Sequence, residues 1–112
     1  MLVIRSDQMK ILEAAMVRNF EGRVMRHLRR SFAPYVGSMG TEELAALIRH
    51  GVNKADAYGI ARELDVVTFV EFMVRYGRAF YSDPNLPWAV QVLQDQTLGG
   101  PEKISKLKEL EG

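Results

Sequence analysis

The chain has 112 residues, 47% hydrophobic and 26% charged, which is the composition of one globular domain and excludes a disordered segment. Its formal net charge of +1 gives no general attraction to a polyanion. The absence of cysteine excludes disulfides, zinc–thiolate sites and a cysteine nucleophile, and it is compatible with the cytoplasmic location that we expect.

The first predicted element is a long helix from about Asp7 to Ser31, with Ser6 as its N-cap. The N-terminal segment before it lacks the long apolar region of a signal peptide, and no run in the chain approaches the ~20 apolar residues of a membrane span. Along the helix, hydrophobic residues recur every three or four positions and form one stripe: Met9, Leu12, Met16, Phe20, Val24, Leu28 and Phe32. We therefore expect one face of this helix to pack on a core.

A loop is predicted at residues 33–40, "APYVGSMG", because it contains Pro34 and two glycines. A second helix follows, capped by Gly40 or Thr41. Its apolar face consists of Leu44, Leu47, Ile48, Val52 and Ala55. Gly59 is expected to adopt the left-handed conformation past the end of this helix, with Ile60 folding back in apolar contact.

The third predicted helix runs from about Arg62 to Tyr76 and ends at Gly77. Its apolar residues occupy more than one face, which is typical of a helix flanked on several sides: Leu64, Val66, Val67, Phe69, Val70, Phe72, Met73 and Val74. The run "DVVTFV" could also form a strand. The helix is favoured because the apolar pattern exceeds strand length and no other segment offers a partner strand.

Two short helices are predicted at the C-terminal end, each opened by a proline, Pro87 and Pro101. The second, residues 99–112, is amphipathic, with Ile104, Leu107 and Leu110 on one face, and could lie at the periphery. We therefore predict a single domain over residues 1–112, an all-α compact bundle of four to five helices. In this bundle the long N-terminal helix packs on the buried third helix.

The segment "RVMRHLRRSF", residues 23–32, carries the clearest candidate site. Arg23, Arg26 and Arg30 share one helical face by their i+3 and i+4 spacing, and are expected to dock an acidic surface of a partner protein. Alternatively, they pair with the protein's own carboxylates, such as Glu21 or Glu71. Residues 1–32 hold seven Lys or Arg and three Asp or Glu, whereas the rest holds eight and eleven, so such pairing is available.

Other candidate sites are weaker. His27 and His50 have no second ligand at metal spacing, and we expect neither a metal nor another cofactor. No nucleophile motif or phosphate loop is present, so an enzyme is not expected. Trp88, the sole tryptophan, would cap the core beside the third helix or serve as an interface hot spot. The methionines are expected to fill gaps in the core rather than to line a groove.

Five segments together resemble a family of small bacterial proteins found in type VI secretion and related contractile-tail gene neighbourhoods. They are "VIRSDQM" at 3–9, "FEGRVMRHLRRSF" at 20–32, "LIRHGVNKADAYGI" at 47–60, "ELDVVTFVEFM" at 63–73 and "DPNLPWA" at 83–89. Family members usually have a polar capping residue where this sequence has Ala61 or Arg62. The resemblance implies an accessory role beside spike and effector proteins and supplies no catalytic residue.

The expected function is therefore a non-catalytic binding protein, an adaptor or chaperone that helps load an effector or spike protein. The alternative is an immunity protein that neutralises a cognate toxin. A module of a different class, one that binds nucleic acid, is disfavoured because aromatic residues are not interleaved with the basic ones and no helix-turn-helix spacing is clear. A homo-oligomer remains compatible with the sequence, and no membrane partner is expected.

Overall fold

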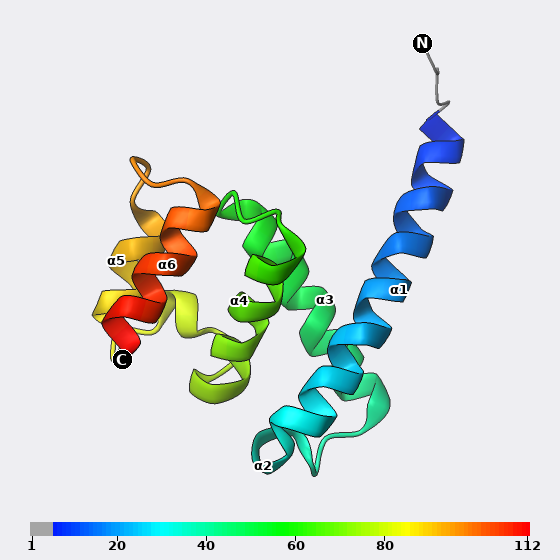
Figure 1. The fold of residues 1–112 in the computed structure, drawn as a ribbon, viewed down its shortest axis with the longest axis horizontal. Coiled ribbons are helices and arrows are strands. Elements are labelled where there is room, and N and C mark those ends of the chain that lie inside the picture. The colour runs from blue at the N-terminus through cyan, green and yellow to red at the C-terminus, as the bar shows by residue number, and fades with distance from the viewer. Residues whose placement is uncertain (1–5) are drawn as a thin grey trace.

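The structure is a computed structural model that describes the backbone of residues 6–112 and the side chains of residues 18–112. This part of the chain contains six α-helices, one short 3₁₀ helix and no strand (Figure 1). The elements are α1 (Ser6–Ser31), α2 (Ala33–Val36), α3 (Thr41–Ala57), α4 (Glu63–Tyr76), η1 (Phe80–Ser82), α5 (Pro87–Gln94) and α6 (Gly100–Glu111). The predicted all-α class is confirmed.

Helix α4 is the centre of the bundle, as predicted. Figure 1 shows it between α3 and α1 on one side and α5 and α6 on the other. Its buried apolar residues are Val66, Phe69, Val70, Phe72 and Met73. The run "DVVTFV" is therefore helical, because burial on several sides outweighs the strand preference of its β-branched residues. One predicted core position is wrong: Leu64 is 79% exposed.

The predicted stripe on α1 is confirmed where side chains are described. Phe20, Val24 and Leu28 are buried, and Phe32 packs partly buried just past the helix end. The side chains of Met9, Leu12 and Met16 lie outside the described residues. The helix rests mainly on α3 and reaches α4 through ion pairs, so its inward face joins the same core as the central helix.

The end of α3 has the geometry that the sequence predicts. Gly59 adopts a φ of 77°, and its N–H donates to the carbonyl of Asp56 at 3.0 Å. The N–H of Ile60 donates to the carbonyl of Ala55 at 2.9 Å. These two bonds satisfy the last carbonyls of the helix in a Schellman motif. The buried Ile60 side chain then anchors the turn that leads into α4.

The start of α4 lacks a side-chain cap. The helix begins at Glu63, and its N-cap residue Arg62 makes no capping hydrogen bond through its side chain. This agrees with the absence of a polar capping residue at Ala61 or Arg62. The acidic residues Glu63 and Asp65 lie in the first turn, where their charge interacts favourably with the helix dipole.

The loop predicted at residues 33–40 is wrong in its first half, where a single helical turn, α2, forms. Proline is tolerated in a first turn, so Pro34 does not prevent it. The fully buried Val36 side chain holds the turn in place, and the carbonyl of Val36 accepts a hydrogen bond of 2.8 Å from the Arg29 side chain. A one-turn helix has no periodicity, so no sequence pattern indicates it.

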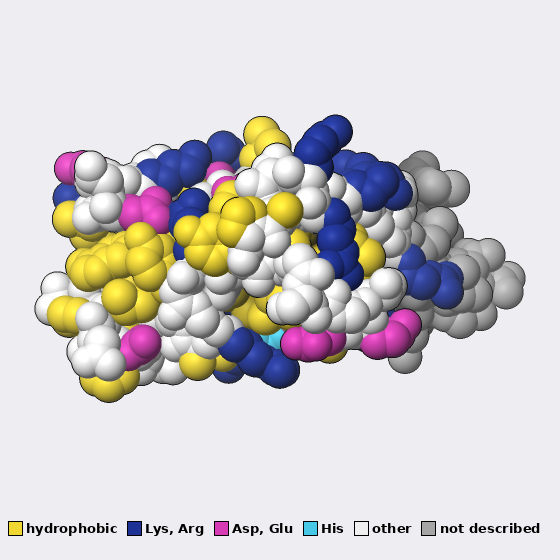
Figure 2. All heavy atoms as spheres, turned by 90° about the horizontal axis from the view of Figure 1, so that it is seen from below, with side chains coloured by type: hydrophobic (Ala, Val, Ile, Leu, Met, Phe, Trp, Pro, Cys, Tyr) yellow, Lys and Arg dark blue, Asp and Glu magenta, His cyan; other side chains and the backbone are white. Residues whose placement is uncertain are grey.

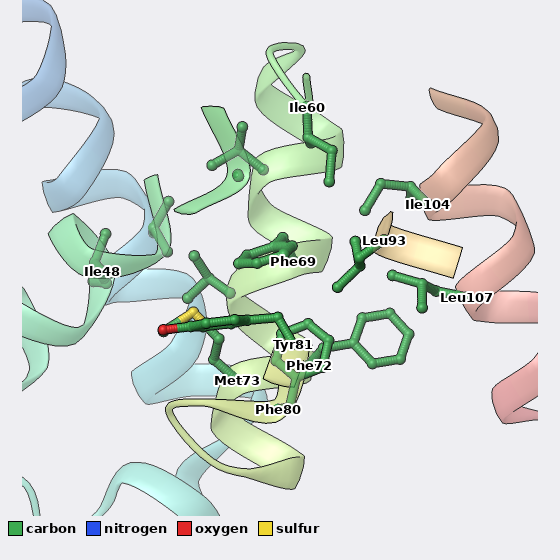
Figure 3. Packing of buried hydrophobic residues seen from close by; sticks show 14 of the residues in the cluster. Ile48, Ile60, Phe69, Phe72, Met73, Phe80, Tyr81, Leu93, Ile104 and Leu107 are labelled. Atoms are coloured by element: carbon green, nitrogen blue, oxygen red, sulfur yellow. The ribbon is translucent and has the colours of Figure 1, made fainter. Parts of the chain in front are cut away.

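The C-terminal helices α5 and α6 pack on each other and complete the core around α4 (Figure 3). Ala89, Leu93, Ile104 and Leu107 are buried. Leu110 is predicted on the same face, yet it is 46% exposed, and in the last turn of α6 it is Glu111 that contacts α4, through Arg75 and Tyr76.

Candidate functional site: the arginine face of α1 and its surroundings

The arginine stripe on α1 is divided by the fold. Arg23 donates two hydrogen bonds to Glu63 at the start of α4, of 3.1 and 3.0 Å. This pair raises the pKa of Arg23 and lowers the pKa of Glu63 through the side-chain hydrogen bonds. The two side chains are 48% and 59% exposed, so water screens the pair and it adds little to stability. Its main effect is to occupy the guanidinium group of Arg23.

The other two arginines of the stripe are exposed, and neither forms an ion pair with a residue that the structure describes. They border a shallow depression of about 490 Å³ lined by Gly22, Met25, Arg26, Arg29 and Arg30. Figure 2 shows several Lys and Arg side chains along the α1 side of the molecule. Arg26 and Arg30 therefore remain available to an external carboxylate.

The two carboxylates suggested as internal partners of the stripe have other partners. Glu21 is buried and accepts a hydrogen bond of 3.0 Å from Arg49 on α3. Glu71 lies 2.7 Å from the Nε2 atom of His27. The fold thus connects α1 to α3 and to α4 by separate ion pairs, and it uses Arg23 rather than Arg26 or Arg30 for this purpose.

A second hollow, of about 520 Å³, lies between α1 and α4 and contains the Arg23–Glu63 and His27–Glu71 pairs. Asp65, with a side chain only 10% exposed, also lines it. The Nε atom of Arg62 is 3.0 Å from the Asp65 Oδ2 atom, but that oxygen accepts no hydrogen bond, so the contact is ionic rather than directional. The charged groups of this hollow are largely paired with one another. These pairs connect the helices and do not form a reactive centre.

Among the described residues, no three His, Asp or Glu side chains converge as metal ligands do. In the same part of the chain, no helix combines the length and hydrophobicity needed to cross a membrane.

Trp88, the fourth predicted site residue, lies at the edge of the core. It is half-buried and packs edge-on against Tyr76, with ring centroids 5.8 Å apart and an interplanar angle of 81°. Leu110 is exposed, and Figure 2 shows hydrophobic side chains gathered at the end of the molecule formed by α5 and α6. The structure does not bring Trp88 together with the arginine face of α1.

Sequence reasoning missed a third polar cluster, formed by His50 and Lys54 of α3 with Tyr81 of η1. The Nε2 atom of His50 lies 2.8 Å from the Tyr81 hydroxyl. The Lys54 ammonium lies 5.2 Å from the centroid of the Tyr81 ring. The i, i+4 spacing predicts that His50 and Lys54 lie on the same side of α3. The contact between His50 and Tyr81 cannot be predicted from spacing, because 31 positions separate the two residues in the sequence.

Stability should fall as the pH falls from about 7.5 to 5.5, with His50 as one cause. Burial, then Arg78 and Lys54, lower the pKa of His50 below its ordinary value of 6.5. His50 is therefore protonated more readily in the unfolded chain than in the folded protein. The contribution of His50 to the free energy of unfolding is fully present above pH 6.5 and is lost as the pH falls from 6.5 toward the lower pKa of the folded state. Urea unfolding at several pH values should show a shallower pH dependence for His50→Gln than for the unsubstituted protein. Equal slopes would exclude His50 as a cause.

Comparison of the chain with protein-family models, with curated proteins and with solved structures gave no match.

Proposed function

We propose that this protein is a non-catalytic protein-binding accessory factor, an adaptor or chaperone for an effector or spike protein of a type VI secretion cluster in the cytoplasm. The observation that carries the binding role is the pair of exposed arginines, Arg26 and Arg30, on one face of α1 with no carboxylate partner among the described residues. The secretion context comes from the sequence resemblance alone.

The chemistry of this face favours an acidic partner surface. Arg26 and Arg30 lie one turn apart, and the shallow depression beside them exposes the backbone at Gly22 and part of Met25. Guanidinium groups can bind carboxylates through two parallel hydrogen bonds, and arginine is enriched at the centres of protein interfaces. Opposite charge on the partner would mainly speed the encounter and set the orientation.

Reversing the charge of both arginines, Arg26→Glu with Arg30→Glu, should slow association with the effector or spike protein encoded nearby by tenfold or more. The association rate is measured by surface plasmon resonance at low and physiological salt. Arg23 is left unchanged in this variant because a glutamate there would face Glu63 and disturb the fold.

The matched control reverses two exposed lysines of α6, Lys106→Glu with Lys108→Glu, which changes the net charge by the same amount. Thermal melting establishes that both variants fold. An unchanged association rate for the folded Arg26/Arg30 variant would remove this face from the interface and leave the surface around Trp88 as the next to test.

Two further assays separate the proposed adaptor from its alternatives. An adaptor abolishes secretion of its partner when it is lost, whereas an immunity protein protects a cell that expresses the toxin. Nucleic-acid binding should be weak at physiological salt, because two free arginines neutralise few phosphates. Sub-micromolar binding of duplex or single-stranded DNA at that salt would favour the nucleic-acid alternative over the proposal.

A further inference from the structure

The cluster around His50 lies on α3, η1 and the turn that precedes η1, and none of its residues belongs to the arginine face. His50 and Lys54 are four residues apart on α3, so they project from the same side of that helix. Tyr81 is buried, yet its hydroxyl reaches His50 at 2.8 Å. Figure 3 shows the Tyr81 ring running from the core beside Phe69 and Phe72 toward α3, with the hydroxyl oxygen at its outer end.

Arg78 brings a second cationic side chain to this cluster, beside Lys54. It belongs to the turn between α4 and η1, three residues before Tyr81, and that turn is fixed by a hydrogen bond of 3.1 Å from the N–H of Phe80 to the carbonyl of Gly77. Arg78 is exposed, and its charge lowers the pKa of His50, after burial and ahead of the charge of Lys54. The charges of Arg78 and Lys54 therefore act on the same imidazole group.

No carboxylate among the described residues is paired with these basic groups. Neither Lys54 nor Arg78 forms an ion pair there, and no carboxylate contributes to the pKa shift of His50. The same protein pairs Arg23, Arg49, Arg62 and Arg75 with carboxylates. Like charges held together without an anion repel one another, and an added anion would relieve that repulsion.

The available donors are also of the chemical kind that binds an oxyanion. An ammonium group offers three N–H donors and a guanidinium offers a planar fork. Neutral His50 and Tyr81 use one donor in the hydrogen bond between them, which leaves the pair one further donor for a ligand. Charge-assisted bonds from such groups to carboxylate or phosphate oxygens are about twice as strong as bonds between neutral groups. Tyr81 is fixed by its burial and by its contact with His50, so part of this arrangement is rigid before any ligand arrives.

We propose that His50, Lys54, Arg78 and the Tyr81 hydroxyl form a binding site for an oxyanion, a phosphate or a carboxylate group. This site is separate from the arginine face of α1 and does not depend on the proposed function. The alternative is that the three basic groups are solvated independently and bind no anion beyond ordinary screening.

The two histidines provide an internal comparison for the test. Side-chain resonances of His50 and His27 are followed by NMR at constant pH while inorganic phosphate is added, with sodium chloride at equal ionic strength as the reference. Phosphate should shift the His50 resonances along a saturable curve and raise the pKa of His50. The resonances of His27, which is paired with Glu71, should respond alike to phosphate and chloride. Parallel titrations with acetate and glutarate distinguish a carboxylate preference from a phosphate preference.

Substitution of the basic groups then assigns the site. Lys54→Gln and Arg78→Gln each remove one charge-assisted contact and should each weaken phosphate binding by about tenfold. Lys106→Gln, an exposed position on α6 outside both proposed sites, serves as the control and should leave phosphate binding unchanged. The proposal is overturned if His50 responds to phosphate and chloride equally, or if folded Lys54→Gln and Arg78→Gln variants bind phosphate as tightly as the unsubstituted protein.

Discussion

Replacing Phe69 by alanine should lower the free energy of unfolding by about 3–5 kcal/mol. Phe69 is fully buried in α4, and its ring packs against those of Phe80, Tyr81 and Tyr58, with centroids 5.1, 6.2 and 6.3 Å away. Truncation would leave a cavity among rings that come from two separate segments, η1 and the turn that follows α3. Since a domain of this size is stable by about 5–15 kcal/mol, the variant would lose a large part of its stability.

Urea unfolding followed by circular dichroism measures this loss. Leu64→Ala is the control on the same helix, because its side chain is 79% exposed, and it should change stability by less than about 0.5 kcal/mol. A loss for Phe69→Ala as small as that for Leu64→Ala would contradict the central position of α4. A far-ultraviolet spectrum dominated by strand would contradict the helical fold as a whole.

The parts of this fold that the sequence predicts are those governed by local interactions. Hydrophobic periodicity indicates α1, α3 and α4, and glycine and proline mark their ends. Gly59 is a clear case, because its left-handed backbone is required by the two hydrogen bonds that close α3. Pro87 begins α5 as predicted, since its fixed φ suits a first helical turn.

The exposed Leu64 shows where local pattern is insufficient. It lies in a helix that is apolar on several sides, and periodicity does not reveal which of those sides remains uncovered. The uncovered side is set by where α3 and α6 pack on α4, which depends on the whole chain. The same limit explains why Leu110, in phase with two buried residues of α6, is exposed while Glu111 of the same turn contacts α4.

The sequence predicts the candidate site only in part, for a similar reason. Helical spacing correctly places Arg23, Arg26 and Arg30 on the outer side of α1, away from Val24 and Leu28. It does not show that Arg23 meets Glu63, 40 residues further along the chain. Pairing of this kind requires the packing of α1 against α4 to be known, and it decides which arginines of the stripe remain free.

Replacing Gly100 by alanine should lower the free energy of unfolding by about 1–3 kcal/mol or more. Gly100 begins α6, where a Cβ atom would lie 2.3 Å from the carbonyl oxygen of Gly59 and 3.0 Å from the Cα atom of Ile60. Both are backbone atoms of the turn that ends α3, and that turn is fixed by its own hydrogen bonds and by the buried Ile60 side chain. Helix α6 would therefore have to move away and partly uncover Ile104 and Leu107.

Gly22→Ala provides a control with the opposite expected sign. Gly22 lies inside α1, and the nearest atom to an added Cβ would be the end of the flexible Arg26 side chain, 3.6 Å away. Alanine there should raise stability by about 0.5–1 kcal/mol, because it favours the helix and meets no obstacle. The two variants make the same chemical change, so urea unfolding isolates the effect of position. If Gly100→Ala also raised stability, the close approach of α6 to the turn at Gly59 could not be present in solution.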